Sequence, residues 1–85
     1  MNATALLVHG MGSAAAWWEP LRPVLTRHGL KPHAVELPSL ESAGPESWAA
    51  VVLQAIPTRG RVVLIGHSLG GGVCLDVVRR RAVDL

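Results

Sequence analysis

The sequence predicts an α/β fold, a three-stranded parallel sheet with flanking helices. Three observations lead to this prediction. Short apolar segments at residues 4–8, 31–37 and 62–65 have the length and composition of buried strands. The stretches that separate them, and the stretch after the last, contain helical patterns, so strands and helices alternate along the chain. This alternation favours parallel strands joined by right-handed crossovers.

The length and composition indicate one small domain. The 85 residues contain no internal repeat, low-complexity tract or linker. A chain of this size buries only about 60 to 65% of the surface that its unfolded form exposes. Because 49% of the residues are hydrophobic but Phe and Tyr are absent, the core must consist of Leu, Val, Ala and Ile, with three tryptophans as the large fillers. A disordered chain is excluded.

The charge pattern predicts neither a nucleic-acid partner nor a membrane partner. The net charge is +2, and the eight basic residues are spread along the chain apart from Arg79-Arg80-Arg81. That cluster is more typical of a solvated helix end, where it complements the helix dipole. No apolar stretch approaches the ~20 residues of a membrane-spanning helix, and no basic segment precedes the first apolar run. We therefore expect a cytoplasmic protein.

The presence of a single cysteine, Cys74, is also consistent with a cytoplasmic location. It cannot form a disulfide within the chain, which fits a reducing compartment. Its position in the last predicted helix favours a small buried filler over a nucleophile.

The first half of the chain predicts a strand, a loop and a helix. Residues 4–8 are apolar without alternation, as expected for a strand covered on both faces. Residues 9–18 are small and without periodicity, which indicates a loop. Pro20 and Pro23 lack N–H donors, which is tolerated only in a first turn, so the helix is predicted to begin near Glu19 and to end at a glycine.

The middle of the chain continues the alternation. The second strand, 31–37, has a weaker pattern because Pro32 and Glu36 interrupt it. Residues 38–45 form a loop by their Gly, Pro and Ser content. A helix is predicted at 46–56, where a proline stops it.

The most informative stretch is Gly66-His67-Ser68-Leu69-Gly70. It lies between the strand 62–65 and a helical pattern that runs to about Arg81, which is the strand–turn–helix setting that the spacing G-x-S-x-G requires. So sharp a turn holds Ser68 in a strained conformation and leaves no space for a Cβ at Gly66 or Gly70. The Ser68 hydroxyl would then lie at the helix N-terminus, where free N–H groups stabilise developing negative charge.

A second motif supports this interpretation. His9-Gly10-Met11-Gly12 directly follows the strand 4–8. In their order and context the two motifs resemble those of the α/β-hydrolase superfamily, in which an oxyanion loop of the HG type follows a central strand. The resemblance implies a partial α/β-hydrolase fold in which the strand 4–8 lies between the other two.

The resemblance also implies roles for individual residues. Ser68 would be the catalytic nucleophile, and the backbone N–H groups of Met11 and Leu69 would form the oxyanion hole. The remaining motif residues would support the site structurally: His9, Gly10, Gly66, His67 and Gly70.

The implied activity is that of a serine hydrolase acting on an ester, thioester or amide through an acyl-enzyme. Its partner would be a small-molecule acyl substrate, and no cofactor is implied. No two histidines have the spacing of metal ligands, so no metal site is predicted. Trp17 and Trp18 follow the oxyanion loop and either pack in the core or border an acyl pocket.

The acid and the histidine that would activate Ser68 are missing from the sequence. In the family the chain order is serine, then an acid, then histidine, but the seventeen residues after Ser68 contain no histidine. Asp76 lies within the predicted helix and Asp84 near the last residue, so neither matches the family's acid. His67 should point away from its neighbour Ser68, and His9 should make a structural hydrogen bond to the loop. His28 and His33 are expected at the surface.

The resemblance therefore implies that residues 1–85 are the N-terminal part of a truncated α/β-hydrolase domain. We expect the isolated chain to be inactive. The strand 62–65 would form a sheet edge without the lysine, proline or inward charge that protects native edges. Self-association through this exposed edge is therefore expected.

Two alternatives stay open. Gly10-Met11-Gly12-Ser13-Ala14-Ala15 also fits the dinucleotide-binding pattern of a Rossmann fold, with Glu36 at the end of the next strand. In that fold the glycines open the helix directly, which would place Pro20 and Pro23 inside it at a cost of ~3 kcal/mol or more each. The other alternative is a non-catalytic module that retains the hydrolase fold without its chemistry.

Overall fold

The structure, a computed structural model, describes residues 3–38 and 45–80. Strands and helices alternate along the chain as expected. In order, the elements are β1 (Ala3–Val8), the 3₁₀-helix η1 (Ala15–Leu21), α1 (Arg22–Arg27), β2 (Leu30–Val35), α2 (Pro45–Ala55), β3 (Arg61–Gly66) and α3 (Leu69–Arg80).

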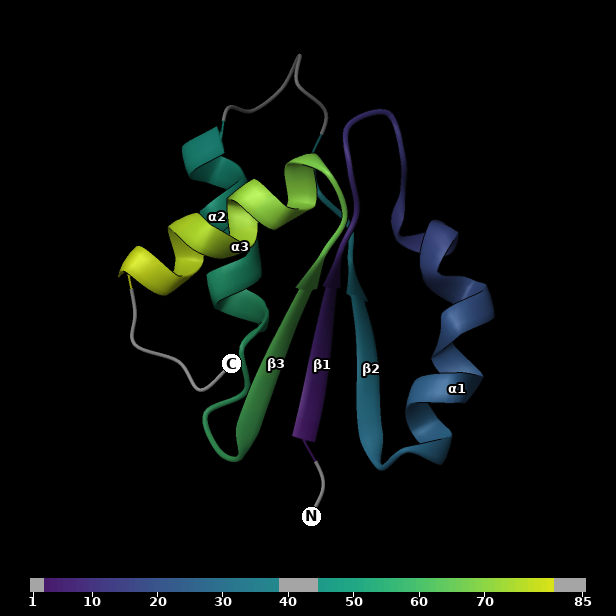
Figure 1. Cartoon of the computed structure of the whole chain (residues 1–85). Helices are drawn as coiled ribbons and strands as arrows, with labels where there is room; N and C mark the ends of the chain where they lie inside the picture. The colour runs from purple at the N-terminus through teal and green to yellow at the C-terminus, as the bar shows by residue number, and fades with distance from the viewer. Residues whose placement is uncertain (1–2, 39–44, 81–85) are drawn as a thin grey trace.

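The three strands form one parallel sheet in the order β2-β1-β3, which confirms the predicted fold class and strand order (Figure 1). Val8 at the end of β1 is level with Val35 of β2 and with Gly66 of β3. All three strands therefore end at the same side of the sheet, where their carboxyl ends lie. The loop after β1 and the turn before α3 both leave from this side, so the register brings the two sequence motifs together.

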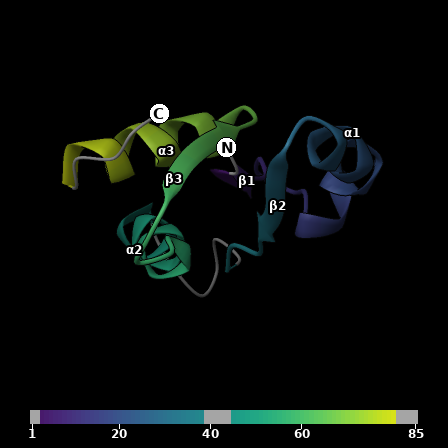
Figure 2. The ribbon, with the colours of Figure 1, turned by 90° about the horizontal axis from the view of Figure 1, so that it is seen from below.

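Helices cover both faces of the sheet (Figures 1 and 2). Leu6 and Val8 of β1 belong to the larger core, with α2 and α3, whereas Ala5 and Leu7 pack with Trp18 of η1 on the opposite face. Successive side chains of a strand point to opposite faces, so a central strand is apolar wherever helical layers cover both of its faces. This explains the apolar run at residues 5–8 of β1, all of which are buried.

The prediction for the segment before α1 is wrong in its first part. Instead of a loop up to residue 18, the 3₁₀-helix η1 begins at Ala15 and includes Pro20, and the α-helix begins only at Arg22. The proline argument applies to α-helical hydrogen bonds, and a short 3₁₀ turn tolerates the loss of one donor. Trp18 contributes the main packing of η1, since its ring is buried against the sheet.

The other boundaries differ from the predictions by one or two residues. β2 ends at Val35 because the backbone N–H of Leu37 bonds to the His9 side chain instead of continuing the strand. Of the loop predicted at 38–45, residues 39–44 lie outside the described residues, as do Arg81 and Asp84. Within the described ranges, no helix is both long and apolar enough to span a membrane.

Cys74 packs in the larger core with Val73 and Val77 of α3. Burial raises the pKa of its thiol, so the thiolate is disfavoured. The residue is a buried filler, as its position in the sequence predicts.

Candidate active site

Ser68 occupies a tight turn between β3 and α3. Its φ angle is 55°, and among the described residues it is the one non-glycine residue with a positive φ. The turn is fixed from both sides, because the His67 N–H donates to the Val8 carbonyl (3.1 Å) and the Gly70 N–H donates to the His67 carbonyl (2.9 Å). Ser68 is exposed to solvent, one residue before α3 begins. Left-handed backbone at an L-residue costs roughly 1–2 kcal/mol, and strain of this kind is typical of functional sites.

The glycines two residues to either side of Ser68 have no room for a side chain. A Cβ at Gly66 would lie 2.5 Å from the carbonyl oxygen of Gly70, and a Cβ at Gly70 would lie 2.7 Å from the carbonyl oxygen of His9. Both obstacles are backbone atoms, which cannot move aside as a flexible side chain does. The close approach of α3 to β3 and to the end of β1 therefore requires glycine at both positions.

The loop after β1 packs directly against this turn. A Cβ built on Gly10 would lie 3.1 Å from the carbonyl oxygen of His67 and 3.4 Å from the Cβ of Ser68. Met11, the next residue, is 64% exposed. Figure 1 shows this loop and the start of α3 at the same edge of the sheet. The fold thus brings together the two motifs that lie about 57 residues apart in the sequence.

The backbone N–H groups of Met11 and Leu69 are available to a ligand. Within residues 3–38 and 45–80, neither N–H donates to a protein acceptor. For Leu69 this follows from its place as the first residue of α3, since the first N–H groups of a helix have no partner within the helix. The positive end of the helix dipole adds to the attraction for an anion at this position.

His9 is a buried structural residue. Its Nδ1 lies 2.9 Å from the carbonyl oxygen of Gly10, and the N–H of Leu37 donates to its Nε2 over 3.0 Å. These two bonds require the neutral ring to carry its proton on Nδ1. His9 thereby links the loop after β1 to Leu37, two residues beyond the end of β2. Its contact with Gly10 is the hydrogen bond to the loop that the sequence analysis expects.

Glu36 is a part of this site that the sequence did not reveal. Its Oε1 accepts the N–H of Ala15 over 3.4 Å, and its Oε2 lies 3.1 Å from the Nε2 of His9. In the neutral ring Nε2 has no proton to donate, so the second contact is an ion pair only when His9 is protonated. Glu36 and Ala15 are 21 residues apart, a separation that no local pattern encodes.

The same carboxylate weighs against the dinucleotide alternative. In a Rossmann fold the first helix after the glycines presents its N–H groups to a pyrophosphate. Here the N–H of Ala15, the first residue of η1, already binds the Glu36 carboxylate, whose negative charge would repel a phosphate.

The two tryptophans after the loop have different environments. Trp18 is 5% exposed and lies in the core, whereas Trp17 is 52% exposed. The Trp17 ring stacks on His67, with ring centroids 4.5 Å apart and an interplanar angle of 28°. It also meets Trp18 in a T-shaped contact at 5.0 Å. His67 is therefore engaged with Trp17.

No candidate general base is hydrogen-bonded to Ser68 in the described parts of the chain. In residues 3–38 and 45–80, neither a histidine nor a carboxylate hydrogen-bonds to the Ser68 hydroxyl. Asp76 instead forms an ion pair with Arg80 over 3.1 Å on α3. His28 and His33 are exposed, at the end of α1 and in β2, and Asp84 lies outside the described residues.

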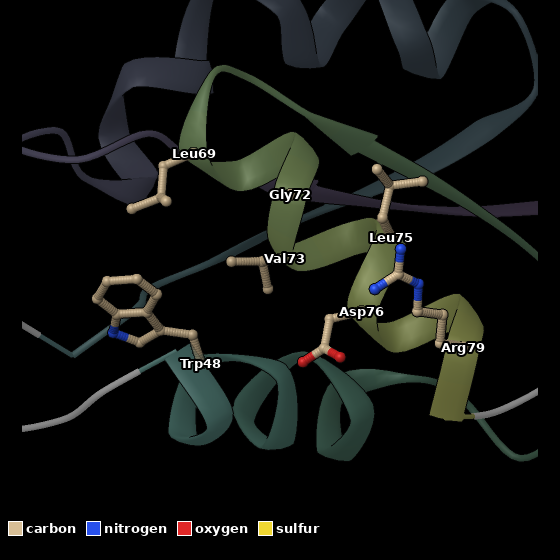
Figure 3. Close-up of a pocket in the computed structure, with 7 residues that line it drawn as sticks. All are labelled: Trp48, Leu69, Gly72, Val73, Leu75, Asp76 and Arg79. Atoms are coloured by element: carbon tan, nitrogen blue, oxygen red, sulfur yellow. The ribbon is translucent and has the colours of Figure 1, made fainter.

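A separate groove of about 360 Å³ lies between α2 and α3. Leu69 and Trp48 lie at one end and Arg79 at the other (Figure 3). The indole N–H of Trp48 donates to the carbonyl of Pro38. Ser68 does not line this groove, although its neighbour Leu69 does.

Comparison with known proteins identifies the family. A profile of the family described as "Alpha/beta hydrolase family" matches residues 5–85. This chain belongs to the α/β-hydrolase family. The solved structure of polyneuridine aldehyde esterase superposes on 94% of the chain with a TM-score of 0.76 and 29% sequence identity. The three-stranded parallel sheet and its flanking helices are therefore a partial α/β-hydrolase fold.

Curated relatives of this α/β-hydrolase include an esterase and a synthase. Pimeloyl-(acyl-carrier protein) methyl ester esterase of Aromatoleum aromaticum is 36% identical over 80 residues, which cover 88% of this chain and 31% of that protein. Norfluorocurarine synthase 1 of Strychnos nux-vomica is 34% identical over 77 residues, 78% of this chain and 29% of that protein. The chain spans about one third of the length of the curated relatives it matches.

Proposed function

We propose that Ser68 is the nucleophile of an acyl-transfer reaction in which an ester is hydrolysed through an acyl-enzyme. One observation carries the proposal: an exposed serine with a φ of 55° stands at the N-terminus of α3, directly against the loop that follows β1. Strained backbone at a helix N-terminus exposes the serine hydroxyl to a substrate. It also places the hydroxyl beside unpaired N–H groups, which stabilise the negative charge that forms when a carbonyl is attacked.

The reaction follows from this arrangement. The Ser68 Oγ forms a bond to the carbonyl carbon while a base removes its proton, and the carbonyl oxygen becomes an oxyanion. The N–H groups of Met11 and Leu69 stabilise this oxyanion. When the tetrahedral intermediate collapses, the alcohol leaves with the proton and the acyl group stays on Ser68. Water then attacks the acyl-enzyme by the same route and releases the acid.

Two of the names favour an ester over a thioester or an amide. The Aromatoleum relative is a methyl ester esterase, and the superposed structure is that of polyneuridine aldehyde esterase. The reaction also needs a base and an acid partner, which we place outside residues 3–38 and 45–80. The isolated chain is accordingly expected to attack activated phosphonates slowly and to turn over esters hardly at all.

Labelling with a fluorophosphonate tests the proposal. Ser68 should displace fluoride from the phosphorus and retain the phosphonyl group, which intact-mass and peptide mass spectrometry locate. Ser68→Ala should lose the label. Ser47→Ala is the matched control, because Ser47 is an exposed serine on α2 and should leave labelling unchanged.

Two results would contradict the proposal. Labelling that persists in Ser68→Ala would assign the reactivity to another residue. A folded chain that reacts with no fluorophosphonate even at high pH, where a hydroxyl loses its proton more readily, would favour the non-catalytic module.

A further inference from the structure

Two large apolar side chains are exposed beside Ser68. Met11 is 64% exposed and Trp17 is 52% exposed, and both belong to the segment that follows β1. Among the described residues, the third exposed large hydrophobic side chain, Leu75, lies on α3 away from this segment. Single exposed apolar residues need no explanation, but two on the segment that packs against a candidate nucleophile suggest a ligand contact.

Trp17 is held in place by its neighbours. His67 covers its ring in a stack, and Trp18 meets it in a T-shaped contact. The backbone N–H of Trp17 also donates to the Ala14 carbonyl over 3.0 Å, which fixes the backbone at the start of η1. An aromatic ring that is already ordered binds apolar groups at a low entropic cost, because little side-chain freedom remains to be lost.

The position of Trp17 relative to Ser68 follows from shared neighbours. Trp17 stacks on His67, the residue that precedes Ser68, and Gly10 packs against both His67 and Ser68. The ring therefore borders the turn on the side of the loop that carries Met11. A substituent that extends from a carbonyl bound at Ser68 across Gly10 and His67 would meet this ring.

We propose that Trp17 is a specificity-determining residue that binds the aromatic or extended apolar acyl group of a neutral ester. This inference rests on the proposed role of Ser68 and adds the chemical class of the acyl group. The acyl side of the ester is the one that remains on Ser68 in the acyl-enzyme, so contact with Trp17 persists through both halves of the reaction.

The charges around the segment favour an uncharged acyl group. Met11 and Trp17 carry no charge, and the Glu36 carboxylate is bound at Ala15, two residues before Trp17. The Glu36 side chain is 63% exposed, so its negative charge repels an anionic group that approaches the segment after β1. An acyl group with its own carboxylate is expected to bind more weakly than the neutral one.

The test measures binding apart from chemistry. In the Ser68→Ala background, which cannot form an acyl-enzyme, the affinities for methyl phenylacetate, methyl acetate and phenylacetate are measured by NMR titration. We expect methyl phenylacetate to bind most tightly and Trp17→Ala to weaken it about fivefold, the scale of one aromatic contact. Trp17→Phe should restore most of the affinity, and Leu75→Ala should leave it unchanged.

A second readout covers the case in which Trp17→Ala does not fold. With Trp17 intact, methyl phenylacetate should shift the indole N–H signal of Trp17, while that of Trp48, which is bonded to the Pro38 carbonyl, should stay unchanged. No binding, or equal affinity for methyl phenylacetate and methyl acetate, overturns the inference. A shift at Trp48 alone also overturns it.

Fluorophosphonate labelling separates this inference from the proposed function. If Trp17-dependent binding is observed but Ser68 in the unsubstituted chain is never labelled, the hydrolase proposal fails and the apolar subsite stands. If Ser68 is labelled at the same rate by benzyl and methyl phosphonofluoridates, in both the unsubstituted chain and Trp17→Ala, the hydrolase proposal stands and the specificity inference fails.

Discussion

Gly70 lies against the carbonyl group of His9, so closely that a Cβ on Gly70 would come within 2.7 Å of the oxygen. This contact packs the first turn of α3 against the end of β1 and thereby places the turn at Ser68 beside the loop that follows β1.

Gly70→Ala is therefore expected to destabilise the fold although it lies in a helix. In an open helical position, alanine is more favourable than glycine by roughly 0.5–1 kcal/mol. At position 70 the added methyl group meets backbone atoms, and overpacking of this kind costs about 1–3 kcal/mol. The free energy of unfolding, measured by urea denaturation, should fall by that amount.

Gly72→Ala is the matched control. Gly72 lies in the same helix, is exposed, and has no atom within 4 Å of a built Cβ. This variant should be more stable than the unsubstituted chain by roughly 0.5–1 kcal/mol. If Gly70→Ala is stabilised to the same extent, the close contact with β1 is absent in solution.

Replacement of Ser68 by glycine should stabilise the chain while removing its reactivity. The positive φ costs an L-residue roughly 1–2 kcal/mol, and the greater freedom of glycine in the unfolded state offsets about 0.5–1 kcal/mol of the gain. Ser68→Gly should thus raise the free energy of unfolding by several tenths of a kcal/mol or more. Ser68→Ala keeps the strain and should change it little. Thermal and urea denaturation would disprove the strain if the glycine variant were less stable than the alanine variant.

Much of this arrangement could be predicted from the sequence, because it depends on local patterns. The unbroken apolar run of β1 indicates a central strand, and the spacing of Gly66, Ser68 and Gly70 indicates the turn before α3. These features are encoded within a few residues of one another. Their family resemblance also gave the correct order of the strands.

The contacts that complete the site could not be predicted in the same way. The His9–Leu37 bond joins residues 28 positions apart, and the Trp17–His67 stack joins residues 50 positions apart. Both depend on the register of the sheet, which brings the ends of the strands to one edge. The 3₁₀-helix η1 was missed because burial of Trp18 outweighs the local preference for a loop.

His9→Ala is expected to destabilise the end of β2. It removes the acceptor of the buried Leu37 N–H and the donor to the Gly10 carbonyl, and an unsatisfied buried polar group costs about 1–3 kcal/mol. The free energy of unfolding should fall by at least that amount, and hydrogen exchange at the Leu37 amide should accelerate. His28→Ala, at an exposed position, should stay within about 0.5 kcal/mol of the unsubstituted chain. Equal effects of the two substitutions would contradict the structural role of His9.

Cys74 should make the stability of the fold decrease in alkaline solution. Burial raises the pKa of its thiol above the ordinary value of 9.0, so between these two pKa values the folded state binds more protons than the unfolded state. The stability from the neutral buried thiol is complete below pH 9 and is lost as the pH rises through the folded-state pKa. Urea denaturation from pH 7 to 10.5 should show a steeper alkaline decline than in Cys74→Ala. Identical declines would show that the thiol is not buried in solution.

The free edge of β3 predicts self-association. Among the described residues β3 pairs only with β1, and no lysine or proline occurs in it, whereas the opposite edge strand β2 contains Lys31 and Pro32. Unprotected edges pair readily with a second chain. We expect the average mass in analytical ultracentrifugation to increase with protein concentration.

Val63→Lys should suppress this association, because a lysine in the edge strand places a charge where a second strand would pack. Val63 is half-buried in the middle of β3. Leu75→Lys is the matched control, since it adds the same charge to an exposed apolar position on α3. If Leu75→Lys rather than Val63→Lys yields the monomer, the copies meet through the surface of α3. A monomeric unsubstituted chain at every concentration would show that the β3 edge does not pair between copies.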